Sequence, residues 1–105
     1  MKFVETPIFT GEVSAFLDDE EYRSLQMALV LRPEQGKLIP GGAGLRKIRW
    51  ALVDRGKRSG CRVIYYWSKM EETIYMLLAY RKSKQEDLTP TQLECLRMLV
   101  RRELK

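Results

Sequence analysis

The chain has 105 residues, enough for one domain; 45% are hydrophobic, 31% are charged, and the formal net charge is +5. This composition allows a modest core and excludes a disordered tail, and the longest apolar run, Ile74 to Tyr80, is too short to span a bilayer. We expect a single domain over residues 1–105, no membrane partner and, since no signal-peptide pattern opens the chain, a cytoplasmic location.

The N-terminal residues predict a short strand followed by a short helix. Residues 3–6 have the composition of a strand, which Pro7 closes. Thr10 is the expected N-cap of the helix, whose apolar face extends to Leu17. These two elements are brief, so we expect them to be held by packing against the rest of the domain.

A second helix and a loop follow. Asp18, with Glu21 three residues later, forms a capping-box pattern at the start of this helix. The helix should end near Arg32, because Pro33 disfavours helical geometry in the residue before it. Residues 34–44 include a glycine-rich run and are predicted to be loop.

The C-terminal half predicts three strands and a helix. Residues 45–53 and 62–67 form two strands, and the polar stretch at residues 55–60 is a hairpin loop between them. Residues 73–80 are apolar enough for a strand buried on both faces, and a capping box at Thr89 opens a C-terminal helix. The fold class is therefore α+β, a small single domain in which two N-terminal helices and a C-terminal helix pack on an antiparallel sheet.

The positive charge is concentrated in the middle of the chain. From Arg46 to Arg62, seven basic residues oppose Asp54 alone, whereas residues 1–45 hold four basic and seven acidic residues. Such a patch is typical of a surface that binds a polyanion, and nucleic acid is the commonest one. The alternative is a charged surface that only keeps the protein soluble, which the clustering makes less attractive.

Strand periodicity predicts that several basic side chains converge. Lys47 and Arg49 share one face of their strand, Arg62 opens the next strand, and Arg81 and Lys82 follow the last one. If these strands are neighbours, the side chains can bind a phosphodiester at several oxygens. The alternative is a solvated sheet face that carries charge for solubility.

Composition also limits the chemistry. No histidine is present, which excludes Ser-His-Asp and Cys-His sites and the histidine pair common in ribonucleases. Cys61 lacks a base partner and is a poor nucleophile, and Cys95 is expected in the core. We expect no metal and no cofactor. Trp50 is expected to pack in the core, whereas Tyr66 and Tyr80 either pack there or stack on RNA bases.

Three motifs occur in order along the chain. They are Gly-Leu-Arg-Lys-Ile-Arg at residues 44–49, a basic two-glycine hairpin at residues 56–60, and Tyr-Arg-Lys at residues 80–82. In this order they resemble the RelE/HigB superfamily of bacterial toxins, and most closely its HigB-like branch. The resemblance covers nearly the whole chain and implies a RelE-like fold.

The resemblance implies the toxin of a type II toxin–antitoxin system. Such a toxin is a ribosome-dependent endoribonuclease that cleaves mRNA in the ribosomal A site and inhibits translation. The RNA's own 2′-hydroxyl is the nucleophile, and no metal or cofactor takes part. The resemblance also implies a cognate helix-turn-helix antitoxin, with operator DNA contacted only through that antitoxin.

The resemblance also assigns residues by position. Arg62 is expected to stabilise the pentacovalent phosphate, and Lys82 lies beside the leaving 5′-oxygen. The catalytic set is Lys47, Arg49, Arg62 and Lys82, and the RNA-binding set is Arg46, Lys57, Arg58, Arg81 and Tyr80. Leu88 stands where some RelE-type members have a tyrosine, so the general acid and base stay open. The alternative function is a non-catalytic basic module that binds nucleic acid or a partner and acts as a corepressor subunit.

Overall fold

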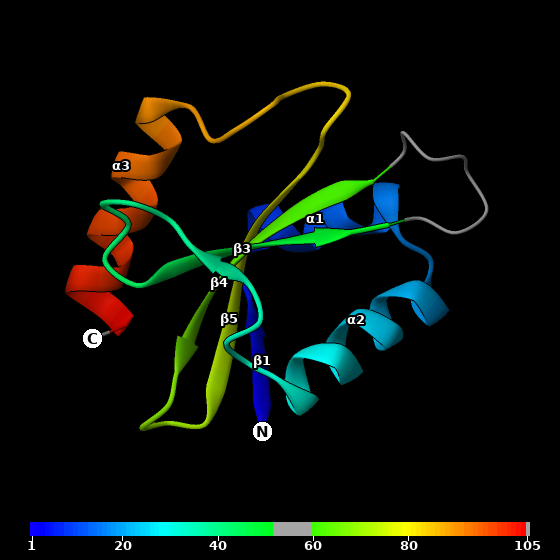
Figure 1. The fold of residues 1–105 in the computed structure, drawn as a ribbon, viewed down its shortest axis with the longest axis horizontal. Coiled ribbons are helices and arrows are strands. Elements are labelled where there is room, and N and C mark those ends of the chain that lie inside the picture. The colour runs from blue at the N-terminus through cyan, green and yellow to red at the C-terminus, as the bar shows by residue number, and fades with distance from the viewer. Residues whose placement is uncertain (52–59, 105) are drawn as a thin grey trace.

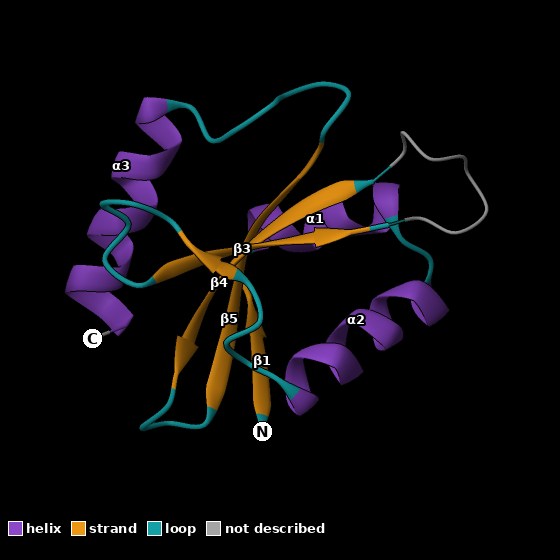
Figure 2. Cartoon of the chain, in the orientation of Figure 1, coloured by secondary structure: helices purple, strands orange, loops and turns teal. Residues whose placement is uncertain are grey.

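The elements form a five-stranded sheet with helices on both faces (Figures 1 and 2). The computed structural model describes residues 1–51 and 60–104, and all that follows concerns these residues. No helix among them is long and apolar enough to cross a membrane. In chain order the elements are β1 (Lys2–Glu5), α1 (Pro7–Phe16), α2 (Asp19–Leu31), β2 (Lys37–Leu38), β3 (Leu45–Trp50), β4 (Cys61–Ser68), β5 (Thr73–Arg81), α3 (Pro90–Leu99) and a π-helical turn η1 (Val100–Leu104).

The strand order is β1-β5-β4-β3-β2. The pairs β3–β4 and β4–β5 are antiparallel, as predicted, but β1 runs parallel to β5, so the sheet is mixed rather than wholly antiparallel. Strands joined by short connections must be antiparallel, whereas β1 and its partner β5 are far apart in the chain, with two helices between them, and can pair in either direction. The β2 strand lies in the segment predicted to be loop, where two residues are too few to show a period. The predicted hairpin at residues 55–60 and the extension of β3 to residue 53 fall mostly outside the described residues.

The helix starts follow the capping chemistry, with one correction. The predicted capping box of Asp18 and Glu21 is present at the start of α2, and Arg32 caps its end. However, α1 begins earlier than expected: its N-cap is Thr6, whose hydroxyl oxygen accepts from the Phe9 N–H at 3.0 Å. The prediction of Thr10 as N-cap was wrong, because proline both ends a strand and favours the first helical position.

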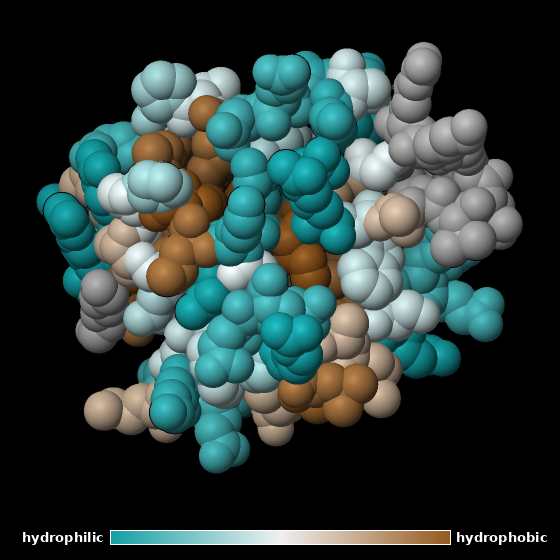
Figure 3. Space-filling model, viewed as in Figure 1, coloured by the Kyte–Doolittle hydropathy of each residue, from teal (hydrophilic) through white to brown (hydrophobic). Residues whose placement is uncertain are grey.

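The sheet divides the apolar core into two clusters. One cluster, between the sheet and the helices α1 and α2, contains fully buried residues such as Phe9, Leu25 and Val63. The other, between the sheet and α3, contains Leu45 and Ile64. The apolar side chains of β5 enter both clusters, which confirms the strand predicted to be buried on both faces. In Figure 3 hydrophobic side chains gather over α3, on the left of the view.

The α3 helix covers only part of its sheet face. Its predicted capping box at Thr89 is present, and its apolar side chains pack against the cluster that contains Leu45. At one end of β3 Leu45 is fully buried, while Arg49 at the other end is exposed. Cys95 is exposed on α3, so its predicted place in the core was wrong. The uncovered end of this face is therefore available for a ligand.

Candidate functional site

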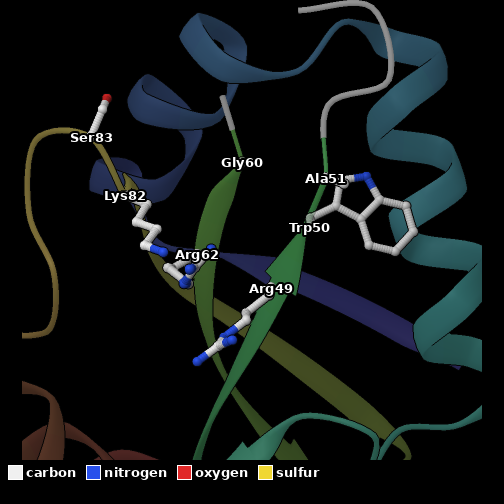
Figure 4. Close-up of a pocket in the computed structure, with 7 residues that line it drawn as sticks. All are labelled: Arg49, Trp50, Ala51, Gly60, Arg62, Lys82 and Ser83. Atoms are coloured by element: carbon white, nitrogen blue, oxygen red, sulfur yellow. The ribbon is translucent and has the colours of Figure 1, made fainter. Parts of the chain in front are cut away.

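The basic residues of β3 and β4 meet at the uncovered end of the sheet. Arg49 and Arg62 are direct partners across the β3–β4 pair, and Lys82 lies in the turn after β5. In Figure 4 the ends of the Lys82 and Arg62 side chains lie close together, and Arg49 extends from the neighbouring strand below them. They line one cavity of about 470 Å³, together with Trp50, Ala51, Gly60 and Ser83. The predicted convergence of Arg49, Arg62 and Lys82 is therefore present.

Arg62 is the most unusual side chain of this cluster. It is only 7% exposed, and the hydrogen bond recorded for its guanidinium is a long one, 3.5 Å, to the carbonyl of Cys61. None of the described carboxylates forms an ion pair with Arg49, Arg62 or Lys82. Burying an unpaired charge is costly, and like charges directly opposite on a sheet repel. An anion bound among the three cations would relieve both penalties.

Lys47 lies beside this cluster but has a partner. Its ammonium group is 3.3 Å from a carboxylate oxygen of Asp87, whose side chain is 74% exposed. Partial burial acts to raise the pKa of Asp87, but hydrogen bonds from the Leu88 N–H and from Lys47 leave that pKa below its usual value. Lys47 lines a neighbouring cavity that Arg49 also lines, so the two cavities are adjacent. The catalytic set predicted from the sequence is thus gathered in one region.

Two residues of the predicted RNA-binding set lie elsewhere. Arg46 donates to the carbonyls of Glu34 and Gly36, both at 2.9 Å. Arg81 is 5.4 Å from the centroid of the Phe16 ring and donates to the carbonyl of Ala15 on α1. The alternation of a strand explains both positions, because each residue is adjacent in sequence to a site residue and faces the other way. Two more members of that set, Lys57 and Arg58, lie outside the described residues.

The aromatic residues near the site are mostly buried. Trp50 packs against the core cluster under α1 and α2, as predicted, and points away from the three cations in Figure 4. Tyr66 packs against the other cluster. Tyr80 is 6% exposed, so its ring offers no stacking surface, but its hydroxyl is buried and has no hydrogen-bond partner among the described residues.

Cys61 is close to the site but is poorly suited to nucleophilic chemistry. Burial raises the pKa of its thiol to about 11, although the positive charge of Arg62 opposes that rise. The side chain is fully buried and stays a neutral thiol near pH 7. This agrees with the expectation from the sequence that Cys61 is a poor nucleophile.

Sequence reasoning missed Asp87, and it missed the hydroxyl of Tyr80, which has no partner in the part of the chain that the structure describes. Asp87 is 40 positions from Lys47 in the chain, and no motif or period links the two residues. The burial of Tyr80 depends on the loop and helix that follow it, so an apolar run alone does not separate it from an exposed tyrosine. The only feature of the sequence that indicated a buried Tyr80 was the prediction that its strand is buried on both faces.

Comparison with solved structures identifies the fold of this chain. No family model matches the chain. The structure is similar to the intact E. coli RelBE toxin–antitoxin complex, with a TM-score of 0.56 and 15% identity over 76% of this chain and 94% of that chain. It is also similar to a doubly substituted E. coli toxin RelE in the free state, with a TM-score of 0.56 and 19% identity over 81% of this chain and 86% of that one. The chain therefore has the RelE fold, which confirms the predicted α+β class and RelE-like fold.

Proposed function

We propose that this protein is the toxin of a type II toxin–antitoxin system, a ribosome-dependent endoribonuclease that cleaves mRNA in the ribosomal A site. The observation that carries the proposal is the buried guanidinium of Arg62, unpaired by any described carboxylate and flanked by Arg49 and Lys82. The RelE fold and the three RelE/HigB-like motifs support it.

The proposed reaction uses the RNA's own 2′-hydroxyl. Its oxygen gives up its proton to solvent water and bonds to the adjacent phosphorus, while the bond from phosphorus to the 5′-oxygen breaks, leaving a 2′,3′-cyclic phosphate and a 5′-hydroxyl. Negative charge grows on the phosphate oxygens, where fixed guanidinium donors lower the barrier most. In this proposal Arg62 and Arg49 bind those oxygens, Lys82 donates a proton to the 5′-oxygen, and Lys47 helps to hold the phosphate.

The chemistry of the available groups supports the proposal that the enzyme depends on the ribosome. Arginine stays protonated near neutral pH, and lysine needs a strongly lowered pKa to act as a base. A cluster of arginine and lysine is a good electrostatic clamp but a poor proton shuttle by itself. Alignment of the mRNA by the ribosome would supply the missing orientation. We therefore expect free RNA to be a poor substrate.

A protein antitoxin belongs to the same proposal. The RelE structure in the RelBE complex is bound to an antitoxin. For this chain we propose a small helix-turn-helix antitoxin that blocks the toxin in the cytoplasm and alone contacts operator DNA. If this is correct, expression of the protein stops growth, and co-expression of the adjacent reading frame restores it. An adjacent frame that leaves growth arrested would not be that antitoxin.

The direct test is primer extension on mRNA with and without programmed ribosomes. Wild type should produce cuts only when ribosomes are present, and Lys47→Ala and Arg62→Ala should abolish them while both variants stay folded. Rapid cleavage of naked mRNA by the pure protein would refute ribosome dependence. Unchanged cleavage by Arg62→Ala would refute the proposed site.

The alternative is a non-catalytic basic module that binds nucleic acid or a partner as a corepressor subunit. One feature favours it: burial raises the pKa of Tyr80, the cross-strand partner of Arg62, and the pKa of Asp87, the ion-pair partner of Lys47, is lowered. Neither is suited to act as a base near pH 7. Absence of cuts under both conditions, from folded protein that still binds RNA, would establish this alternative.

A further inference from the structure

The hydroxyl of Tyr80 is one of only two buried side-chain polar groups in the described residues that lack a hydrogen-bond partner. The other buried tyrosine near the sheet centre, Tyr65, shows the usual situation. Its hydroxyl donates to the carbonyl of Pro33 at 2.7 Å and accepts from the Gly36 N–H at 2.9 Å. Native proteins rarely leave a buried hydroxyl unpaired, so this exception calls for a ligand or a functional role.

The position of Tyr80 connects it to the basic site. Tyr80 on β5 is the direct cross-strand partner of Arg62 on β4, so both side chains share the sheet face that carries the site. The charges of Asp87 and Arg62 both act on the phenol, so the hydroxyl is near both groups, and Asp87 is in turn paired with Lys47. Lys82 follows two residues later in the chain.

The chemistry of the hydroxyl fits an anion. Burial raises the pKa of Tyr80, Asp87 raises it further, and Arg62 only partly opposes these effects. The phenol therefore keeps its proton near pH 7 and can donate one directional hydrogen bond. The ring and the hydroxyl are both buried, so an RNA oxygen can reach this hydroxyl only when a neighbouring group moves aside.

The carboxylate of Asp87 can move aside and let a phosphate approach Tyr80. Its side chain is 74% exposed, and its ion pair with Lys47 is a surface pair of low strength. A phosphodiester held by Arg62 would repel this carboxylate and compete for Lys47. The carboxylate can turn into water and leave the side of Tyr80, where the phosphate would take its place.

We propose that the hydroxyl of Tyr80 donates a hydrogen bond to a non-bridging oxygen of the phosphodiester that Arg62 binds. This inference rests on the proposed function, since it assigns a further phosphate ligand to the same site. The three cations attract any polyanion, because charge attraction has no preferred direction. A single hydroxyl donates along one direction and therefore favours a phosphate bound in one orientation. Tyr80 would thus determine specificity within a surface that is otherwise mainly electrostatic.

The test compares Tyr80→Phe with Tyr65→Phe, since each change removes one buried hydroxyl and keeps the ring. The ligand is a short single-stranded 2′-O-methyl RNA, which lacks the nucleophile and stays intact. Its affinity is measured by fluorescence anisotropy and folding stability by urea unfolding. Tyr80→Phe should weaken RNA binding about tenfold without loss of stability, the effect of one hydrogen bond to a charged group. Tyr65→Phe should lose stability and keep wild-type affinity once folded.

An Arg62→Gln variant distinguishes a failure of the Tyr80 inference from a failure of the proposed function. If Arg62→Gln weakens RNA binding and Tyr80→Phe binds like wild type, the proposal for Tyr80 is overturned and the proposed function stands. If Tyr80→Phe loses stability as Tyr65→Phe does, the hydroxyl has a structural role and the proposal is also overturned. If wild type binds no better than Arg62→Gln, both the Tyr80 inference and the proposed function fail.

Discussion

The two faces of the sheet differ in whether their buried polar groups have hydrogen-bond or ion-pair partners. On the face covered by α1 and α2, the hydroxyl of Tyr65 has two hydrogen-bond partners, and the surrounding side chains are apolar and fully buried. On the face that α3 partly covers, Arg62 and Tyr80 are almost as deeply buried, yet no described carboxylate pairs with Arg62 and the Tyr80 hydroxyl lacks a partner.

The difference separates stability from function within one small domain. A complete core with satisfied polar groups stabilises the fold, whereas a buried charge and an unpaired hydroxyl cost stability unless a ligand joins them. The same sheet thus has one side that holds the protein together and one end that we propose is completed by RNA. Each prediction below perturbs one side and compares it with the other.

The largest loss of stability is expected on the closed side. Leu25→Ala removes a fully buried side chain of α2 and should lower the free energy of unfolding by about 2–5 kcal/mol. Urea unfolding measures this change. The folded fraction should bind RNA like wild type, because the basic cluster is on the opposite face, and a specific loss of RNA affinity would contradict the separation.

Arg62→Met should act in the opposite way. It replaces a buried charge that no described carboxylate pairs by an apolar side chain of similar length, so the free energy of unfolding should stay unchanged or rise. Ribosome-dependent cleavage should fall by about a hundredfold to a thousandfold, as when one transition-state donor is removed. A clear loss of stability would show that Arg62 has a structural partner and that the two sides are not distinct.

The two tyrosines give a smaller, sharper contrast. Tyr65→Phe leaves the Gly36 N–H without its partner and should cost about 1–3 kcal/mol of unfolding free energy. Tyr80→Phe removes a hydroxyl that has no partner among the described residues and should cost close to nothing. Chemical unfolding of both variants in one buffer, without RNA, measures the difference. Equal losses would contradict the contrast.

The cysteines provide the mildest probe. Burial raises the pKa of Cys61 to about 11, so the thiol stays protonated below that pH, and its reaction with iodoacetamide at pH 8 should be slow. Cys95 is exposed and should react readily in the same sample. Peptide mass spectrometry distinguishes the two, with reaction in urea as the control. Equal rates in the folded protein would mean that the buried face opens easily.

Much of this organisation could be predicted from local rules. The capping boxes at Asp18 and Thr89 depend on residues three apart, so the sequence shows them directly. The convergence of Arg49 and Arg62 follows from strand alternation and from antiparallel pairing of neighbouring strands. The same alternation turns Arg46 and Arg81 to the other face, although the strand argument had included Arg81 in the converging set and both residues had been placed in the RNA-binding set.

The remaining features depend on contacts between distant residues. The Lys47–Asp87 pair joins a strand to a loop that no periodicity describes. The burial of Tyr80 depends on how α3 and the preceding loop pack, and the parallel pairing of β1 depends on the path of the chain around the sheet. Such contacts follow from tertiary packing, which short motifs do not encode.

The most direct test of the account compares Arg62→Gln with Arg81→Gln in primer extension on programmed ribosomes. The two arginines stand on adjacent strands, one residue out of register, and their side chains lie on opposite faces of the sheet. The account predicts that Arg62→Gln abolishes the cuts and that Arg81→Gln keeps nearly all of them. Equal loss in both variants, or cleavage that survives without Arg62, would contradict it.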